Sequence, residues 1–244
     1  MKAEQFMHLK SVSFLPEKYP TKDYFPFNLK IFQAPATLPF NKRITFFIGE
    51  NGTGKSTLLK ALARKAGIHI WENTERRRFK NNPYENRLYT GVSLEWQNGY
   101  VPGAFFGSDI FRDFTNILDE WAAADPGILS YFGGHSLRTQ SHGQSLMSYF
   151  RSRFKIKGLY LMDEPETALS PRSQIELLKI LGDCRENSDV QFIIATHSPL
   201  LMSCTGAEIY CFDNHRIRPI AYEDTEHYRM YFEFLNNRNL NTEK

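Results

Sequence analysis

Three short apolar runs, rich in β-branched and aromatic side chains, stand out along the chain. They are Ile44–Ile48, Leu159–Met162 and Val190–Ala195. Continuous runs of this length are typical of strands buried on both faces. Apolar residues recur every three or four positions over Ser56–Ala66 and Pro171–Asn187, which predicts helices there. Strands alternating with helices predict an α/β fold, a mostly parallel central sheet flanked by helices.

The rest of the pattern is weaker. The first 40 residues are rich in Pro and aromatics, which predicts loops and edge strands, with Leu29–Gln33 as a strand. Leu88–Trp96 alternates like one or two strands, and Ile110–Ala124 and Leu146–Arg153 are spaced like helices. Glu226–Leu235 is amphipathic, so we expect it to pack against the body as a final helix.

Length and composition narrow the class of protein. The 244 residues are 41% hydrophobic, 23% charged and 14% aromatic, which fits a single globular domain over residues 1–244. No apolar run approaches the roughly 20 residues of a membrane helix, and the first residues do not look like a secretory signal. Three cysteines without metal-ligand spacing favour a reduced, cytoplasmic protein. A secreted disulfide scaffold, a collagen-like chain and a membrane channel are excluded.

The formal net charge of +3 hides an asymmetry. Residues 1–100 carry 16 Lys and Arg against 8 Asp and Glu, whereas residues 101–244 carry 14 against 19. One interpretation is an unevenly charged, solvated surface. The other is a basic half that meets the phosphates of a nucleotide or a nucleic acid. Composition does not choose between them.

A glycine-rich segment joins the first predicted strand to the first predicted helix and fits G-x-x-x-x-G-K-[ST]. Glycines let the backbone wrap a phosphate, and successive N–H groups face the anion. Lys55 would supply charge to the β- and γ-phosphates, and the Ser56 hydroxyl would reach Mg²⁺. The alternative is a glycine-rich turn without a ligand. The predicted nucleotide-binding residues are Gly49, Glu50, Asn51, Gly52, Thr53, Gly54, Lys55, Ser56 and Thr57.

Two acids end the second predicted strand. Adjacent carboxylates after a buried strand are costly unless a cation or hydrogen bonds compensate. Asp163 would hold Mg²⁺ or its water at the carboxyl end of the sheet. Glu164 would orient or deprotonate an attacking water, and Pro165 disfavours a helical conformation at Glu164. The alternative is an acid pair that caps the following helix.

Two further motifs gain meaning from their order in the chain. His197 follows the third predicted strand directly, where it could contact the γ-phosphate or the lytic water. By itself it would more often be a structural or surface histidine. A Ser- and Gly-containing corner precedes the predicted helix Leu146–Arg153 and could bind an anion. Its candidate residues are Ser141, His142, Gly143 and Gln144.

With these motifs in this order, the chain resembles the nucleotide-binding domain of ATP-binding-cassette (ABC) ATPases, in a stand-alone branch of AAA-type ATPases with relatives of the Rad50 and RecF type. The resemblance runs from about Phe40 to the C-terminus. The glycine-rich segment resembles the Walker A loop, Leu159–Glu164 the Walker B strand and His197 the switch histidine. Ser141–Ser145 resembles the signature loop, and Ala168–Arg172 falls where the D-loop lies.

The resemblance implies a P-loop fold of ABC type, with an antiparallel β edge and a helical signature subdomain over roughly residues 104–155. It implies ATP and Mg²⁺ as ligands, with Lys55, Glu164 and His197 catalytic and Ser56 and Asp163 holding the metal. In that family the signature loop of one subunit contacts the γ-phosphate on the other. The resemblance therefore implies a head-to-tail homodimer that forms on ATP.

The sequence departs from the family pattern in several places. His142 replaces the first signature glycine, and Ser170 stands where the D-loop commonly has aspartate. A Q-loop glutamine is missing, with Ser108 or Asp109 as stand-ins and Gln97 and Gln140 as weaker ones. The adenine-stacking aromatic has three candidates, each of which would more often be a core residue: Tyr19, Tyr24 and Phe25.

The main hypothesis is an ATPase that dimerises on ATP and drives a partner. A nucleotide-gated binding module with little turnover is the alternative, and a small-molecule P-loop kinase is a weaker third. The target stays open between a protein effector and a nucleic acid. Arg76–Lys80 and Arg151–Lys157 are basic runs with an interleaved aromatic, which suit nucleic acid but are more often solvated faces.

Overall fold

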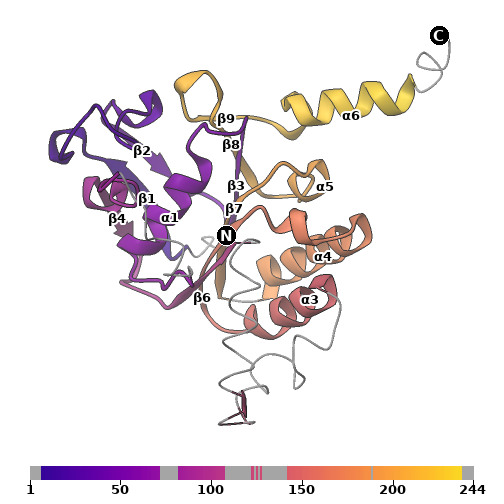
Figure 1. Ribbon diagram of the computed structural model, residues 1–244. Helices are drawn as coiled ribbons and strands as arrows, with labels where there is room; N and C mark the ends of the chain where they lie inside the picture. Colours follow the sequence, from indigo (N-terminus) through magenta and orange to yellow (C-terminus); the bar gives the residue numbers. More distant parts are fainter. Residues whose placement is uncertain are drawn as a thin grey trace, which may run out of the picture.

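A six-stranded sheet lies at the centre of the molecule (Figure 1). The computed structural model describes residues 7–71, 82–107, 122–123, 125, 127, 142–187 and 189–237. The strand order is β5-β6-β7-β3-β8-β9, and every neighbouring pair is parallel except β8 with β9. The predicted mostly parallel α/β sheet is therefore confirmed. Its strands are β3 (Ile44–Ile48), β5 (Gly103–Gly107), β6 (Gly158–Asp163), β7 (Val190–Ala195), β8 (Glu208–Cys211) and β9 (Arg218–Pro219).

Helices cover both faces of this sheet. Successive side chains of a strand point to opposite faces, so Phe47 packs in one apolar cluster and Phe46 in the other. The Phe47 cluster lies under α1, and the Phe46 cluster lies under the helices on the other side (Figure 1). All three strands predicted from continuous apolar runs are buried on both faces. The helices are α1 (Lys55–Lys65), α3 (His142–Arg153), α4 (Pro171–Asn187) and α5 (Pro199–Met202).

A second, antiparallel sheet flanks α1 and confirms the expected β edge. Its order is β2-β1-β4, formed by Ala36–Pro39, Leu9–Phe14 and Val92–Trp96. The predicted strand Leu29–Gln33 was wrong. Lys30–Phe32 is a 3₁₀ turn, because Ile31 and Phe32 are both buried, and adjacent residues on one face require a turn. Further 3₁₀ turns are Pro16–Lys18, Leu88–Gly91, Pro165–Ala168, Asp213–His215 and Tyr222–Asp224.

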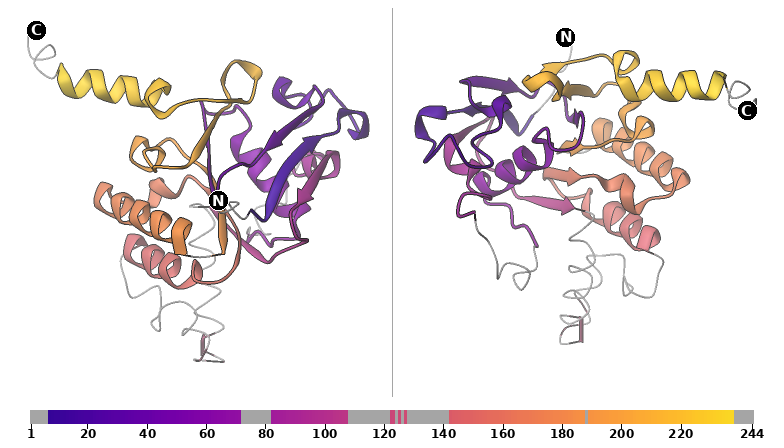
Figure 2. Two further views of the ribbon diagram at one scale, coloured as in Figure 1. Left: turned by 180° about the vertical axis from the view of Figure 1, so that it is seen from behind. Right: turned by 45° about the horizontal axis from the view of Figure 1, so that its top comes forward.

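The C-terminal helix α6 (Glu226–Asn236) forms as predicted, but the expectation that it packs against the body was wrong. Only its first turn contacts the body, where the Tyr228 ring meets Tyr222 with centroids 4.9 Å apart. The rest runs outward, as both views of Figure 2 show. Met230 and Leu235, for example, are each 62% exposed. Among the described helices, α6 included, none has the length and apolar character needed to cross a bilayer.

The predicted helix Ile110–Ala124 and the basic run Arg76–Lys80 fall wholly or largely outside the described residues.

Candidate functional site

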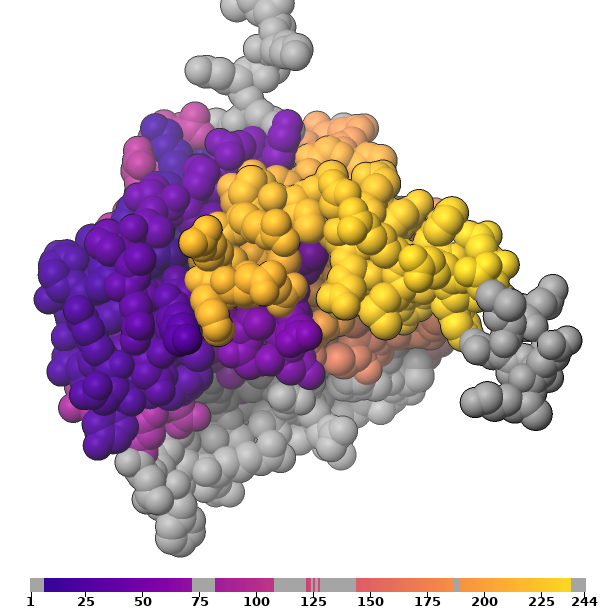
Figure 3. Space-filling view, turned by 90° about the horizontal axis from the view of Figure 1, so that it is seen from above, coloured from indigo at the N-terminus to yellow at the C-terminus, as the bar shows by residue number. Residues whose placement is uncertain are grey.

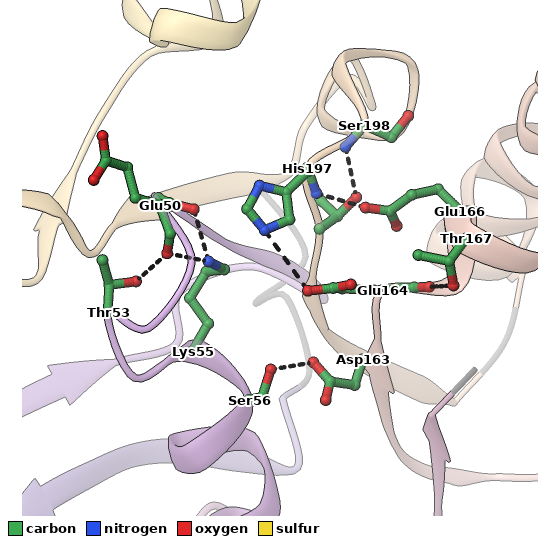
Figure 4. Close-up of polar contacts among 12 residues, drawn as sticks. Glu50, Thr53, Lys55, Ser56, Asp163, Glu164, Glu166, Thr167, His197 and Ser198 are labelled. Atoms are coloured by element: carbon green, nitrogen blue, oxygen red, sulfur yellow. Dashed lines mark hydrogen bonds and ion pairs between the residues drawn. The ribbon is translucent and has the colours of Figure 1, made fainter. Parts of the chain in front are cut away.

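Three strands of the central sheet end side by side. In the strand register, Ala195 at the end of β7 lies opposite both Phe47 of β3 and Asp163 of β6. Each strand is followed at once by one of the predicted motifs, so the parallel order brings all three to one edge. Figure 4 shows Lys55, Asp163, Glu164 and His197 facing a common space at that edge. The structure thus brings together motifs about 100 residues apart in the chain.

The loop after β3 is curved around the Lys55 side chain. Lys55 Nζ donates hydrogen bonds to the carbonyl oxygens of Gly49 and Glu50, over 2.6 and 2.7 Å. Burial lowers the pKa of Lys55, while the nearby carboxylate of Glu164 opposes that change. Gly54 has φ +105°, and a Cβ on it would lie 3.0 Å from the Phe32 ring. The loop therefore presents a buried ammonium at the N-terminus of α1, which suits a phosphate.

Asp213 anchors the start of this loop, and the sequence analysis missed it. Its Oδ1 accepts the backbone N–H of Glu50 over 2.8 Å, and its Oδ2 lies 3.2 Å from the Cys211 sulfur, which donates to it. A Cβ on Gly49 would come within 2.7 Å of Asp213 Oδ1. Gly49 is thus required by the close approach of Asp213. The available signal was an acid directly after the short apolar run Ile209–Phe212, a pattern similar to the one that drew attention to Asp163.

Ser56 and Asp163, the two predicted metal ligands, lie in direct contact. Ser56 Oγ donates a hydrogen bond to Asp163 Oδ1 over 2.7 Å (Figure 4). Burial raises the pKa of Asp163, and the hydrogen bond from Ser56 opposes the rise. Mg²⁺ prefers oxygen ligands and binds through one or two carboxylates together with phosphates and water. This hydroxyl–carboxylate pair fits that donor chemistry.

Glu164 adopts a left-handed conformation, with φ 48° and ψ 55°. This conformation is uncommon for a residue with a side chain and is held by its neighbours. The Glu164 N–H donates to the carbonyl of Ala195 over 2.9 Å, and Thr167 Oγ1 donates to the Glu164 carbonyl over 2.8 Å. The Glu164 carboxylate faces His197, with Oε1 3.7 Å from Nε2. Burial lowers the pKa of His197, with a further contribution from Lys55, which favours a neutral imidazole.

Glu166 is a second functional candidate that the sequence analysis missed. Its Oε1 accepts the backbone N–H of His197 over 2.6 Å, and burial raises its pKa. The contact ties the loop after β7 to the turn after β6. Glu166 is therefore a positioning residue for His197. The sequence signal that could have identified Glu166 was its position two residues after Glu164.

His227 at the root of α6 also lies beside the site. Its ring centroid is 5.6 Å from that of His197, and burial lowers its pKa. Its sequence position gave no sign of this, because α6 reaches the site only through the fold.

One of the three candidates for adenine stacking borders the loop. Phe25 and Thr57 line a cavity of about 140 Å³ beside the first turns of α1. Tyr19 is a core residue: its ring packs on Phe27, and its hydroxyl donates to the Phe32 carbonyl over 2.9 Å. Tyr24 is 57% exposed and is absent from the cavity lining. Of the three candidates, only Phe25 lines this cavity.

The signature and Q-loop candidates are only partly described. Ser141, Ser108, Asp109 and Gln140 lie outside the described residues, and of His142 and Gly143 only their place at the start of α3 is known. Gln144 is exposed in the first turn of α3. Gly107 pairs with Asp163, so the chain leaves β5 beside the site. Gln97 has a structural contact instead, since its Oε1 accepts the backbone N–H of Met7 over 2.8 Å.

Two family models match the chain. Residues 144–203, which include the acids after β6 and His197, match "AAA domain, putative AbiEii toxin, Type IV TA system". Residues 27–64, which include the loop after β3, match "AAA domain". The loop after β3, the acids at the end of β6 and His197 therefore each lie in a segment with an AAA-type match, whereas Ser141, His142 and Gly143 lie outside both segments.

Curated relatives resemble the chain in sequence, and solved structures resemble it in fold. The chain is 25% identical over 184 residues to the phosphate import ATP-binding protein PstB 2 of Streptococcus mutans, covering 64% of this chain and 66% of the relative. The first curated relatives are longer, and the chain spans 40% and 66% of their lengths. The fold matches CbiO1 of Clostridium perfringens (TM-score 0.54, 15% identity, 96% and 98% of the two chains). It also matches the SMC head domain of Thermotoga maritima (TM-score 0.50, 17% identity, 88% and 100%).

Proposed function

We propose that this chain, which carries an ABC-type ATPase domain, binds ATP with Mg²⁺ and hydrolyses its terminal phosphoric anhydride. The observation that carries the proposal is the convergence of Lys55, the Ser56–Asp163 pair and the facing Glu164 and His197 at one sheet edge. We take residues 1–244 to form one cytoplasmic ATPase domain, with its helical part over roughly residues 104–155.

The loop residues bind and orient the nucleotide. The backbone N–H groups of Gly52–Thr57 and the N-terminus of α1 bind the phosphates, and Lys55 exchanges its two carbonyl partners for β- and γ-phosphate oxygens. Ser56 and Asp163 would hold Mg²⁺, which would supply charge neutralisation at the phosphate oxygens. Phe25 stacks on the base at the side of Thr57.

Glu164 and His197 act on the lytic water. Glu164 accepts a proton from the water while the water oxygen bonds to the γ-phosphorus. The bond between the γ-phosphorus and the oxygen that bridges it to the β-phosphate breaks, and ADP leaves with the electron pair. His197, kept neutral by burial, donates from Nε2 to the γ-phosphate and positions it. The left-handed backbone at Glu164 aims its carboxylate at this space.

The dimer completes the site. We propose a head-to-tail homodimer in which Ser141, His142, Gly143 and Gln144 of one copy contact the γ-phosphate bound to the other. Because ATP binds the closed form more tightly than the open form, it shifts the pair towards closure and hydrolysis releases it. Closure acts on a separate partner, either a protein effector or a nucleic acid.

Replacing Glu164 with glutamine tests the proposal. Glu164→Gln should bind ATP as tightly as the wild type, lose at least 100-fold in turnover and accumulate as an ATP-bound dimer. Glu186→Gln, an exposed change on α4, is the matched control and should hydrolyse ATP normally. Equally slow turnover in wild type and Glu164→Gln would contradict the ATPase proposal and favour the nucleotide-gated binding module.

A further inference from the structure

The apolar face of α6 is the largest run of exposed hydrophobic side chains in the described part of the chain. It consists of Met230, Tyr231, Phe232, Phe234 and Leu235, which are 55% to 62% exposed. At 3.6 residues per turn, the charged residues Glu226, Arg229 and Glu233 share one narrow stripe, and the apolar residues fill the rest of the circumference. A surface helix normally has the reverse proportion, with one apolar stripe against the core. Figure 3 shows α6 as a ridge at the edge of the molecule.

The root of this helix is fixed beside the nucleotide site. Thr225 caps α6 by accepting the backbone N–H of Tyr228 over 3.2 Å, and Thr225 is fully buried. His227, in the first turn, packs its ring 5.6 Å from His197. The apolar face therefore continues outward from the edge of the sheet where the nucleotide is proposed to bind.

Area and charge indicate the kind of molecule that covers this face. Five large side chains with about 200 Å² each, roughly 60% exposed, present on the order of 600 Å² of apolar surface. A stable protein interface buries about 800 Å² on each partner, so α6 supplies most of one side. The helix carries two acids and one arginine, which does not suit nucleic acid or an anionic lipid surface, because both select Lys and Arg. The face fits another protein surface.

We propose that α6 docks on a second copy of this chain and forms part of the interface of the ATP-bound dimer. This inference rests on the proposed function, because a second copy is the protein that head-to-tail closure brings to the edge where α6 begins. By two-fold symmetry each copy contributes its α6, so one such face from each copy is buried in the dimer. The contacts that depend on ATP and the contacts made by α6 then form together, in one dimer interface.

Leu235→Glu, made in the Glu164→Gln background, tests this inference. Leu235 is 62% exposed, so the substitution leaves the core intact, and an unchanged thermal midpoint and helix content would confirm folding. With Mg²⁺ and ATP present, sedimentation or light scattering should show the dimer Kd rising at least tenfold. Asn236→Glu is the matched control: it adds the same charge one residue further, on the polar stripe, and should change the Kd by less than twofold.

The outcomes separate the two proposals. If the Glu164→Gln protein stays monomeric with ATP, the ATP-gated dimer of the proposed function fails, and the docking of α6 fails with it. If that protein dimerises and Leu235→Glu dimerises equally well, only the role of α6 is overturned. Equal weakening by Leu235→Glu and Asn236→Glu would also overturn it, because the effect would then come from added charge and not from the apolar face.

Discussion

Replacing Asp213 with alanine should loosen the phosphate-binding loop at its first turn. Asp213 Oδ1 accepts the Glu50 N–H over 2.8 Å, on the loop that also supplies Lys55 with two carbonyl partners. Hydrogen bonds to charged groups contribute about 1.5–3 kcal/mol. Because the Glu50 N–H is exposed and water can replace the lost acceptor, we expect about 1 kcal/mol, or about a fivefold weaker Kd for ATP.

The assay is ATP affinity by calorimetry, with turnover measured in parallel. Asp213→Asn keeps an acceptor oxygen but loses the charge, so its Kd should lie between those of the wild type and the alanine variant. Asp189→Ala, an exposed aspartate distant from the site and 3.9 Å from the Lys157 ammonium, serves as the control. An Asp213→Ala protein that binds ATP within twofold of wild type would refute the anchoring role.

A double-mutant cycle with Gly49 tests the same contact from the other side. In Gly49→Ala the new Cβ would lie 2.7 Å from Asp213 Oδ1 and 3.3 Å from the Phe212 nitrogen, at a backbone φ of +133°. Removing the Asp213 side chain relieves the first clash and leaves the others. The two substitutions should therefore be non-additive by about 0.5 kcal/mol or more in ATP binding. Strict additivity would mean that Asp213 does not constrain Gly49.

Three further predictions follow from the site. Phe25→Ala should weaken ATP binding about fivefold or more through lost stacking, while the affinity for tripolyphosphate stays unchanged. Tyr100→Ala, a change of an exposed aromatic residue, is the control. An equal loss of affinity for both ligands, or the same loss in Tyr100→Ala, would contradict base stacking. Glu166→Ala removes the acceptor for the His197 N–H and should lower kcat about tenfold with little change in KM, and an effect on KM alone would count against a positioning role. Burial lowers the pKa of His227 in the folded chain below its ordinary value of 6.5. Between the folded-state pKa and 6.5 the unfolded chain therefore binds more protons than the folded chain, so the free energy of unfolding decreases as pH falls through that range. His227→Gln should therefore flatten the fall in unfolding temperature between pH 7 and about pH 5, and an unchanged slope would refute it.

The central sheet was predictable because its signals are local. Ile44–Ile48 and Val190–Ala195 are buried on both faces, and such strands show as continuous apolar runs without knowledge of their partners. The motifs that follow them could be placed together because parallel strands share one carboxyl edge. Only the strand ends had to be located correctly for Lys55, Asp163 and His197 to be brought to one site.

Other parts depend on contacts that the sequence does not reveal. Phe32 lies against the position of Gly54, and that tertiary contact favours a turn where alternation suggested a strand. Asp213 reaches Glu50 because β8 pairs with β3, with Cys211 opposite Ile48, and that pairing joins residues far apart in the chain. For α6, amphipathic spacing indicated a helix correctly but could not show whether the covering surface belongs to the same molecule.

Polar contacts join the loops around the proposed γ-phosphate position into one unit. Glu166 accepts the backbone N–H of His197, and Gln174 of α4 accepts the Ser198 hydroxyl over 2.6 Å while donating to the Leu169 carbonyl over 3.1 Å. The turn after β6 and the loop after β7 are thus tied to each other and to α4. His227 extends this unit to the root of α6. A displacement of α6 by a second copy docked as proposed would reach His197 before it reached the loop proposed to bind the phosphates. In the proposed dimer, contact at α6 and the activation of water at Glu164 and His197 would therefore be coupled through the histidine pair, so a weaker α6 contact should slow turnover even where ATP still binds.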